Sequence, residues 1–175
     1  MAFGDNIYRL NQPAFRILIV DDTPADVRLL AELMKNLHHP HEEYAVTNGV
    51  EALDFLYRRG KYVHVPRPNM ILLDMNMPGL SGLEVLAAVK GDPQLSVIPV
   101  LMLSTSSSPE DVHRCYQSHA NVYVQKPRDL EHSQRLIQAI EAFWMDFAVL
   151  PSLDEPVIQA PSRSNGHTPP PLRMM

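Results

Sequence analysis

The chain has 175 residues, of which 45% are apolar, and a formal net charge of −5 that comes from 15 Lys and Arg against 20 Asp and Glu. This composition is typical of one folded domain, and the acidic balance argues against a nucleic-acid partner. No apolar run approaches the roughly 20 residues that span a bilayer, so no membrane partner is expected. The single cysteine, Cys115, cannot form an internal disulfide, which favours a cytoplasmic location.

Short apolar runs alternate with amphipathic segments along the chain. The runs that predict strands cover residues 17–20, 43–47, 70–73, 97–103 and 122–124. The segments that predict helices cover residues 24–37, 50–59, 83–90, 109–119 and 130–148. Strand and helix thus alternate five times, a pattern that predicts an α/β fold with a parallel sheet and helices on both of its faces.

The two ends of the chain differ from this alternating region. Six of the 16 prolines fall within residues 151–175, which contain no aromatic residue and no helical periodicity. Such a stretch predicts an extended tail rather than part of the core. We therefore expect an N-terminal extension over residues 1–13, one folded domain over residues 14–150 and a Pro-rich tail over residues 151–175.

Polar side chains follow four of the predicted strands. In chain order they are Asp21 and Asp22, Asp74, Ser104 and Thr105, and Lys126. An aspartate after one strand is most often a helix cap or a turn residue, but the carboxyl ends of parallel strands meet at one edge of the sheet. Magnesium would relieve the repulsion among the carboxylates, and a metal beside a lysine and a hydroxyl suits a phosphoryl group. One carboxylate could itself attack phosphorus.

The segments Asp21-Asp22, Leu72 to Gly79, Ser104 and Lys126-Pro127 together resemble the receiver domain of two-component response regulators, over about residues 15–148. The resemblance implies a flavodoxin-like, doubly wound five-stranded parallel sheet with five helices and the strand order 2-1-3-4-5. It also implies that Asp74 accepts a phosphoryl group from a sensor histidine kinase. The ligands that it implies for Mg²⁺ are Asp21, Asp22, Asp74 and the backbone carbonyl of Asn76.

The same resemblance assigns roles at the fourth and fifth strand ends. Ser104 would bond one phosphoryl oxygen and Lys126 another, while Tyr123 stands at the aromatic switch position. The bond between Lys126 and Pro127 would be cis. Thr105 departs from the small residue that many receivers have after the switch hydroxyl, and its bulk would slow loss of the phosphoryl group.

Two further segments narrow the resemblance. Residues 57–62 and 65–68 form a long connection between a helix and a strand, and Phe143-Trp144 and Leu150-Pro151 lie near the end of the domain. These features resemble the stand-alone response regulators of bacterial and cyanobacterial phytochromes. The implied kinase is then a phytochrome photoreceptor.

The sequence thus predicts a single-domain response regulator that signals by protein contact or passes its phosphoryl group to another, unknown protein. It would promote its own phosphorylation and dephosphorylation, without being an enzyme that turns over an external substrate. The alternative is a receiver-fold interaction module that works without phosphorylation. An aspartate-based phosphatase is disfavoured, because Asn76 stands where such enzymes need a second carboxylate to act as acid and base.

The last predicted helix carries two apolar stripes, more than one face of a sheet can cover. We therefore expect a homodimer formed by the fourth helix, the fifth strand and the fifth helix, with residues 150–160 reaching across as an arm. The interface residues that this predicts are Cys115, Tyr123, Ile137, Ile140, Trp144, Leu153, Val157 and Ile158.

Three histidines, His38, His39 and His41, cluster around Pro40. Three histidines could bind a transition metal. Their irregular spacing, in a segment that joins a helix to a strand, instead favours solvent-exposed loop side chains.

Overall fold

Five parallel strands form one sheet in the order β2-β1-β3-β4-β5 in a computed structural model that describes residues 14–151 and residue 153. The strands are β1 (Phe15–Val20), β2 (His41–Val46), β3 (Met70–Asp74), β4 (Val100–Ser104) and β5 (Val122–Gln125). The predicted flavodoxin-like sheet and its strand order are therefore confirmed.

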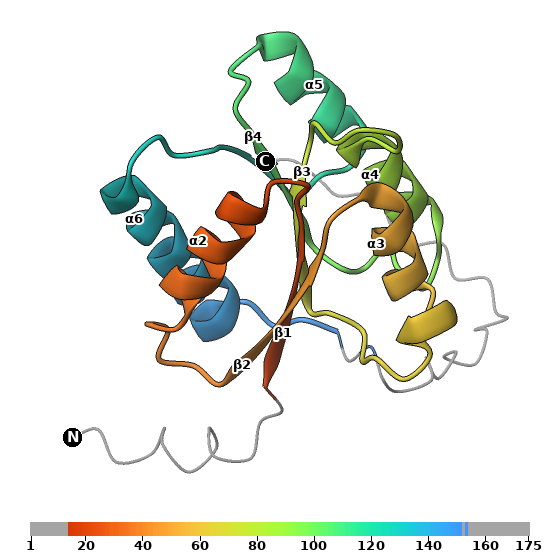
Figure 1. Cartoon of the computed structure of the whole chain (residues 1–175), viewed down its shortest axis with the longest axis horizontal. Coiled ribbons are helices and arrows are strands. Elements are labelled where there is room, and N and C mark those ends of the chain that lie inside the picture. Colours follow the sequence, from red (N-terminus) through yellow and green to blue (C-terminus); the bar gives the residue numbers. More distant parts are fainter. Residues whose placement is uncertain (1–13, 152, 154–175) are drawn as a thin grey trace, which may run out of the picture.

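Helices cover both faces of the sheet (Figure 1). They are α2 (Pro24–Met34), α3 (Gly49–Leu56), α4 (Gly82–Gly91), α5 (Pro109–Gln117) and α6 (Leu130–Ile140), with a short 3₁₀ turn at Gly60–Tyr62 and a π-helical segment at Glu141–Phe147. Helices α2 and α6 lie on one face, and α3, α4 and α5 lie on the other (Figure 1). No helix among the described residues is both long enough and apolar enough to cross a membrane.

Each face of the sheet has its own apolar core. Ile17 and Ile19 of β1 belong to the core beneath α2 and α6, whereas Leu18 and Val20 belong to the core beneath α3, α4 and α5. This division follows from the strand geometry, because successive side chains point to opposite faces. Every residue of β3 and β4 is buried, which explains why these central strands are apolar almost continuously.

The fourth strand begins three residues later than the sequence predicts. Lys90, at the end of α4, donates from its ammonium to the carbonyls of Ser96 at 3.1 Å and Ile98 at 2.7 Å. These bonds hold the preceding segment in a turn, and Val97 is exposed. Regular pairing of the strand consequently starts only at Val100.

The last helix also differs from the prediction of one continuous α-helix. It changes to π-helical geometry at Glu141, whose side chain is buried. Glu141 accepts hydrogen bonds from the backbone N–H of His38 at 2.5 Å and of His39 at 3.1 Å. The wider π-helical turn thus coincides with a carboxylate that ties the end of this helix to the segment between α2 and β2.

The expectation of three solvent-exposed histidines is wrong for two of them. His39 is largely buried between Glu141, 3.0 Å from its Nδ1, and Asp146, 3.1 Å from its Nε2. His41 is also largely buried and lies 3.2 Å from Glu43. Only His38 is exposed. Among the described residues, no group of histidines and carboxylates is arranged to hold a metal ion, so these contacts act as a structural tie.

Residues beyond the π-helical segment lead from one face of the sheet to the other. Trp144 and Met145 pack against the core beneath α2 and α6, whereas Leu153 packs against the core beneath α3, α4 and α5. Leu153 thus contacts its own chain rather than extending away from it. Val157 and Ile158, the other residues of the predicted arm, lie outside the described residues.

We expect the Glu141 tie to fail in acid. Although burial raises the pKa of Glu141, the hydrogen bonds from the His39 ring and the two backbone N–H groups lower it to about 2. The stability that its ionised form provides is therefore complete above its ordinary pKa of 4.5 and is lost as the pH falls toward 2. Glu141→Gln should lower the free energy of unfolding by about 1–2 kcal/mol at neutral pH. Urea denaturation at several pH values should show this difference shrinking below pH 4.5, while the exposed Glu131→Gln matches the wild type.

The first residue of α4 has to be a glycine for steric reasons. A Cβ atom on Gly82 would lie 2.1 Å from the backbone oxygen of Asp74 and 2.9 Å from the Cα of Met75. The start of α4 can therefore approach the end of β3 this closely only without a side chain.

Gly82→Ala should consequently lower the free energy of unfolding by about 2 kcal/mol or more and displace Asp74. Gly91→Ala, at the other end of the same helix, is the matched control, because nothing lies within 4 Å of its added Cβ. Thermal and urea unfolding of the two variants measure the difference. Equal stability of both would contradict the assigned clash.

Candidate functional site

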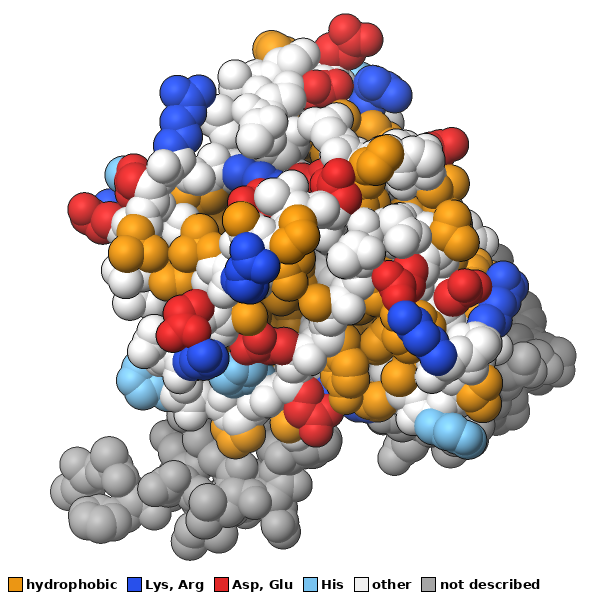
Figure 2. Space-filling view, viewed as in Figure 1, with side chains coloured by type: hydrophobic (Ala, Val, Ile, Leu, Met, Phe, Trp, Pro, Cys, Tyr) orange, Lys and Arg blue, Asp and Glu red, His pale blue; other side chains and the backbone are white. Residues whose placement is uncertain are grey.

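Strand register brings the predicted site residues together at the carboxyl edge of the sheet. Val20 of β1 pairs with Leu73 of β3, and Asp21 and Asp74 are the residues that directly follow this pair. Ser104 pairs with Gln125, and the backbone N–H of Lys126 then donates to the Ser104 carbonyl at 2.7 Å. Acidic and basic side chains accordingly gather at this edge of the molecule, above α2 (Figure 2).

The ammonium group of Lys126 is the centre of the site. Its Nζ lies 2.6 Å from Asp74 Oδ1, 2.7 Å from Asp21 Oδ2 and 2.9 Å from Asp26 Oδ2. Asp21 and Asp74 are buried. One cation therefore compensates carboxylates from two strands and from the first turn of α2. Asp26, in the first turn of α2, is not among the site residues that the sequence predicts.

Burial and charge act on these groups in opposite directions. Burial raises the pKa of Asp74 and the charge of Asp21 adds to this effect, while the hydrogen bond from Lys126 opposes it. Burial alone would lower the pKa of Lys126, but hydrogen bonds to Asp21, Asp74 and Asp26 raise it well above its ordinary range. Lys126 therefore stays charged, and Asp74 is a carboxylate with little water around it to stabilise its negative charge.

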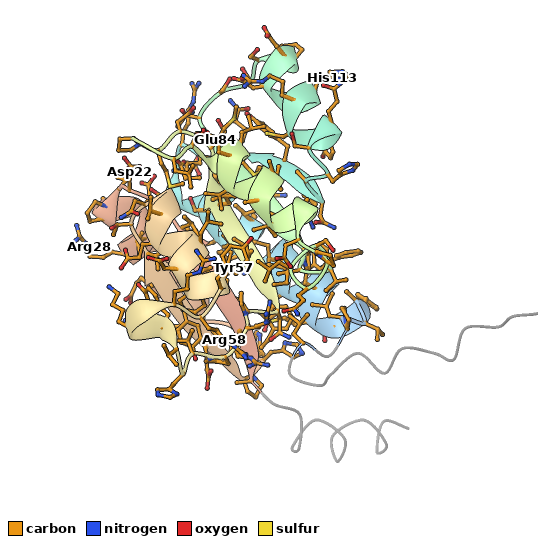
Figure 3. The ribbon with its side chains drawn as sticks, turned by 90° about the vertical axis from the view of Figure 1, so that its right-hand side faces the viewer. Asp22, Arg28, Tyr57, Arg58, Glu84 and His113 are labelled. Carbon is orange, nitrogen blue, oxygen red and sulfur yellow. The ribbon has the colours of Figure 1, made fainter. Side chains whose placement is uncertain are left out.

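The donor set at this edge fits magnesium. Mg²⁺ prefers oxygen ligands and retains several waters, so a few carboxylate and carbonyl oxygens suffice. As the side chains stand, no three of the described carboxylates, histidines or cysteines are arranged around a metal position. Asp22 is partly exposed at the start of α2, at the same end of the molecule as Glu84 and opposite Arg58 (Figure 3). Asn76 is exposed, and its backbone N–H donates to Asp74 Oδ2 at 2.9 Å. Asp21, Asp22, Asp74 and the Asn76 carbonyl would hold the ion.

The loop after β4 is organised by the predicted residues Ser104 and Tyr123 together with Ser106 and Asp111, which the sequence pattern did not single out. The hydroxyl of buried Ser104 accepts the backbone N–H of Ser106 at 3.1 Å. The Ser106 hydroxyl donates to Asp111 at 2.7 Å, and its carbonyl accepts from the Tyr123 hydroxyl at 2.9 Å. Tyr123 thus restrains this loop through its phenol. Thr105 is exposed beside it.

The predicted cis bond between Lys126 and Pro127 is wrong, because no peptide bond among the described residues is cis. The trans form is the more stable one by about 0.5–1 kcal/mol for a bond before proline. Lys126 reaches Asp74 in the trans form.

Several residues of the predicted dimer interface are buried within the chain itself. Cys115 belongs to the core beneath α5, and Ile137 and Ile140 belong to the core beneath α6. Trp144 and Tyr123 are partly buried. The large apolar side chains that this region does expose are Tyr116 of α5, Leu130 at the start of α6, Phe143 and Phe147 of the π-helical segment, and Val149.

Removal of the shared cation should destabilise the protein strongly. Lys126→Met keeps the length of the side chain but leaves two buried carboxylates without compensation, at a cost of about 3 kcal/mol or more. Lys61→Met is the control, because Lys61 is 71% exposed in its ion pair with Glu51 and should change stability by less than about 1 kcal/mol. Urea denaturation at neutral pH would measure both. The loss in Lys126→Met should decrease when magnesium is added or when the pH is lowered, since each reduces the repulsion.

Comparisons with known proteins agree with this geometry. The response regulator receiver domain family matches residues 17–141. Response regulator Rcp1 of Synechocystis sp. is 42% identical over 142 residues, which are 81% of this chain and 97% of that protein.

Two solved structures of similar proteins share the fold closely. The phosphorylated cyanobacterial phytochrome response regulator RcpA matches with a TM-score of 0.77 and 41% identity, over 80% of this chain and 100% of that chain. The Mn²⁺-bound form of Rcp1 matches with a TM-score of 0.75 and 42% identity, again over 80% of this chain and 100% of that chain. Because the family model matches residues 17–141 and the strand order agrees with this fold, the chain belongs to the response regulator receiver domain family.

Proposed function

We propose that this response regulator accepts a phosphoryl group on Asp74, with Mg²⁺ held by Asp21, Asp22, Asp74 and the Asn76 carbonyl. The observation that carries the proposal is the position of Asp74, a buried carboxylate at the sheet edge with the Lys126 ammonium 2.6 Å away. Bound magnesium would offset the charge of the phosphoryl oxygens.

The transfer itself is a displacement at phosphorus. A carboxylate oxygen of Asp74 forms a bond to phosphorus while the bond to the nitrogen of a kinase phosphohistidine breaks. The bonding pair stays on that imidazole nitrogen, so no oxidant or further reactant is needed. Lys126 and the Ser104 hydroxyl then each bond one phosphoryl oxygen. The loop after β4 rearranges as Ser104 does so, and Tyr123, whose hydroxyl bonds to this loop, moves with it. Attack of water on the same phosphorus later returns the carboxylate.

The kinase that we propose is a phytochrome photoreceptor in the cytoplasm. The support is the likeness to RcpA, a phytochrome response regulator by its name, over 80% of this chain. The chain would then signal by contact with a further protein or by passing on its phosphoryl group.

We further propose that the chain forms a homodimer through its last helical segment. Phe147 is 80% exposed, and Phe143 and Val149 are exposed beside it in the sequence. The predicted interface therefore needs revision toward these side chains, since Cys115, Ile137 and Ile140 are buried in the chain itself. A partner chain that covers Phe143 and Phe147 would remove apolar surface from water.

Asp74→Asn should abolish phosphorylation, because an amide is a far poorer nucleophile than a carboxylate. The measurement is the mass increase of one phosphoryl group when the intact chain is incubated with magnesium and acetyl phosphate. Asp22→Asn should slow this labelling by weakening the metal site, and Asp54→Asn, on α3, is the control that should match the wild type.

Two outcomes would contradict the proposal in different ways. Labelling of Asp74→Asn at the wild-type rate would mean that another residue is the acceptor. A wild-type chain that takes up no phosphoryl group, from acetyl phosphate or from a phosphorylated phytochrome kinase, would favour an interaction module that works without phosphorylation.

A further inference from the structure

Asp26 is a fourth carboxylate at the site and lies outside the set that would hold metal and phosphoryl group. It stands in the first turn of α2, and its Oδ2 is 2.9 Å from Lys126 Nζ. It also lines, with Lys126 and Thr105, a cavity of about 240 Å³ between α2 and α6. No other cationic side chain is in contact with Asp26 among the described ion pairs.

The Lys126 ammonium has three N–H donors, and three carboxylates surround it. When Asp74 becomes an acyl phosphate, the donor that faced Asp74 has to turn to a phosphoryl oxygen. The other two donors can remain on Asp21 and Asp26. With two of its three N–H groups fixed, the ammonium directs the third toward the acceptor without a search over side-chain rotamers.

The geometry argues that Asp26 guides the ammonium rather than drawing it away. Lys126 Nζ reaches Asp74 at 2.6 Å while its contact with Asp26 is intact. Asp26 is 41% exposed, so water screens its charge from an incoming phosphoryl group much more than it screens the charge of buried Asp21. Its hydrogen-bonding oxygen, rather than its charge, is then the important feature.

The start of α2 holds Asp26 firmly in place. Pro24 occupies the first turn, where its fixed φ favours helix, and the backbone N–H of Asp26 donates to the Thr23 carbonyl at 3.0 Å. The N-terminus of a helix also favours a negatively charged side chain. Asp26 therefore presents its carboxylate to Lys126 from a rigid element.

We propose that Asp26 is a positioning residue for phosphoryl acceptance, which aims the Lys126 ammonium at the phosphoryl group through a hydrogen bond. The inference rests on the assignment of Asp74 as the acceptor. It predicts that the acceptor oxygen at position 26 matters more than its charge, and that its loss affects the rate of transfer more than the affinity for magnesium.

The test compares Asp26→Ala, Asp26→Asn and Glu110→Ala with the wild type. Glu110 is the matched control, an exposed carboxylate in the first turn of α5, which also begins with a proline. Phosphorylation by acetyl phosphate is followed by intact mass over a range of magnesium concentrations. Asp26→Ala should lower the maximal rate about tenfold or more, because small misplacements of a catalytic group have effects of this size. Asp26→Asn, whose amide oxygen can accept the same bond, should stay within about threefold of the wild type.

A second measurement reads the position of the ammonium directly. In ¹⁵N NMR spectra of the unphosphorylated, metal-free chain, the Lys126 ammonium should give a resolved, slowly exchanging signal in the wild type and in Asp26→Asn. The signal should be lost in Asp26→Ala, while thermal unfolding shows that this variant is folded.

The proposal fails if Asp26→Ala is labelled as fast as the wild type and Glu110→Ala, or if it keeps the Lys126 signal. It also fails if Asp26→Asn is as slow as Asp26→Ala, since the charge would then be the important feature. If the wild type is labelled neither by acetyl phosphate nor by a phosphorylated phytochrome kinase, the acceptor assignment fails, and with it the role of Asp26. That outcome is distinct from a labelled wild type whose rate does not depend on Asp26.

Discussion

The ion-pair cluster around Lys126 is the interaction on which the arrangement of the site depends. One ammonium joins β5 to β1, β3 and α2 through Asp21, Asp74 and Asp26. Without it, buried carboxylates at the ends of two adjacent strands would repel each other in a region that water hardly reaches. The edge of the sheet is therefore held together by the same charges to which we assign phosphoryl chemistry, so stability and the proposed function depend on the same residues.

The backbone around Asp74 is held as firmly as its side chain. The close approach of Gly82 fixes the end of β3 against the start of α4, and the backbone N–H of Met75 donates to the Leu103 carbonyl at 2.9 Å. On the far side of β4, Ser104, Ser106 and Tyr123 form a chain of hydrogen bonds. Asp74 thus lies between the start of α4, which a close backbone contact holds, and the loop after β4, which side-chain hydrogen bonds hold.

The opposite end of the sheet is closed by different means. Buried Glu141 bonds to the segment between α2 and β2, and the chain then passes to the other face of the sheet, where Leu153 completes the core. This path leaves the aromatic side chains of Phe143 and Phe147 exposed on the π-helical segment. This exposed apolar surface, to which we assign the proposed dimer contact, lies at the end of the last helical segment, away from the carboxyl edge.

The sequence by itself predicted the alternating strands and helices and the sheet edge at which polar side chains gather, while the strand order came from the resemblance to the receiver family. The reason is that buried parallel strands are recognisable as apolar runs, and polar residues such as Asp74 and Lys126 that follow them have to meet at one edge. Only the tertiary structure decided that Asp26 joins this set, that Glu141 turns inward to the histidine segment, that Leu153 packs on its own chain and that the bond before Pro127 is trans. Apart from that peptide bond, these contacts join residues that lie far apart in the sequence, as Asp26 and Lys126 do, 100 positions apart. They depend on the rotation and approach of whole helices, which the packing of the two cores sets and which no local pattern records.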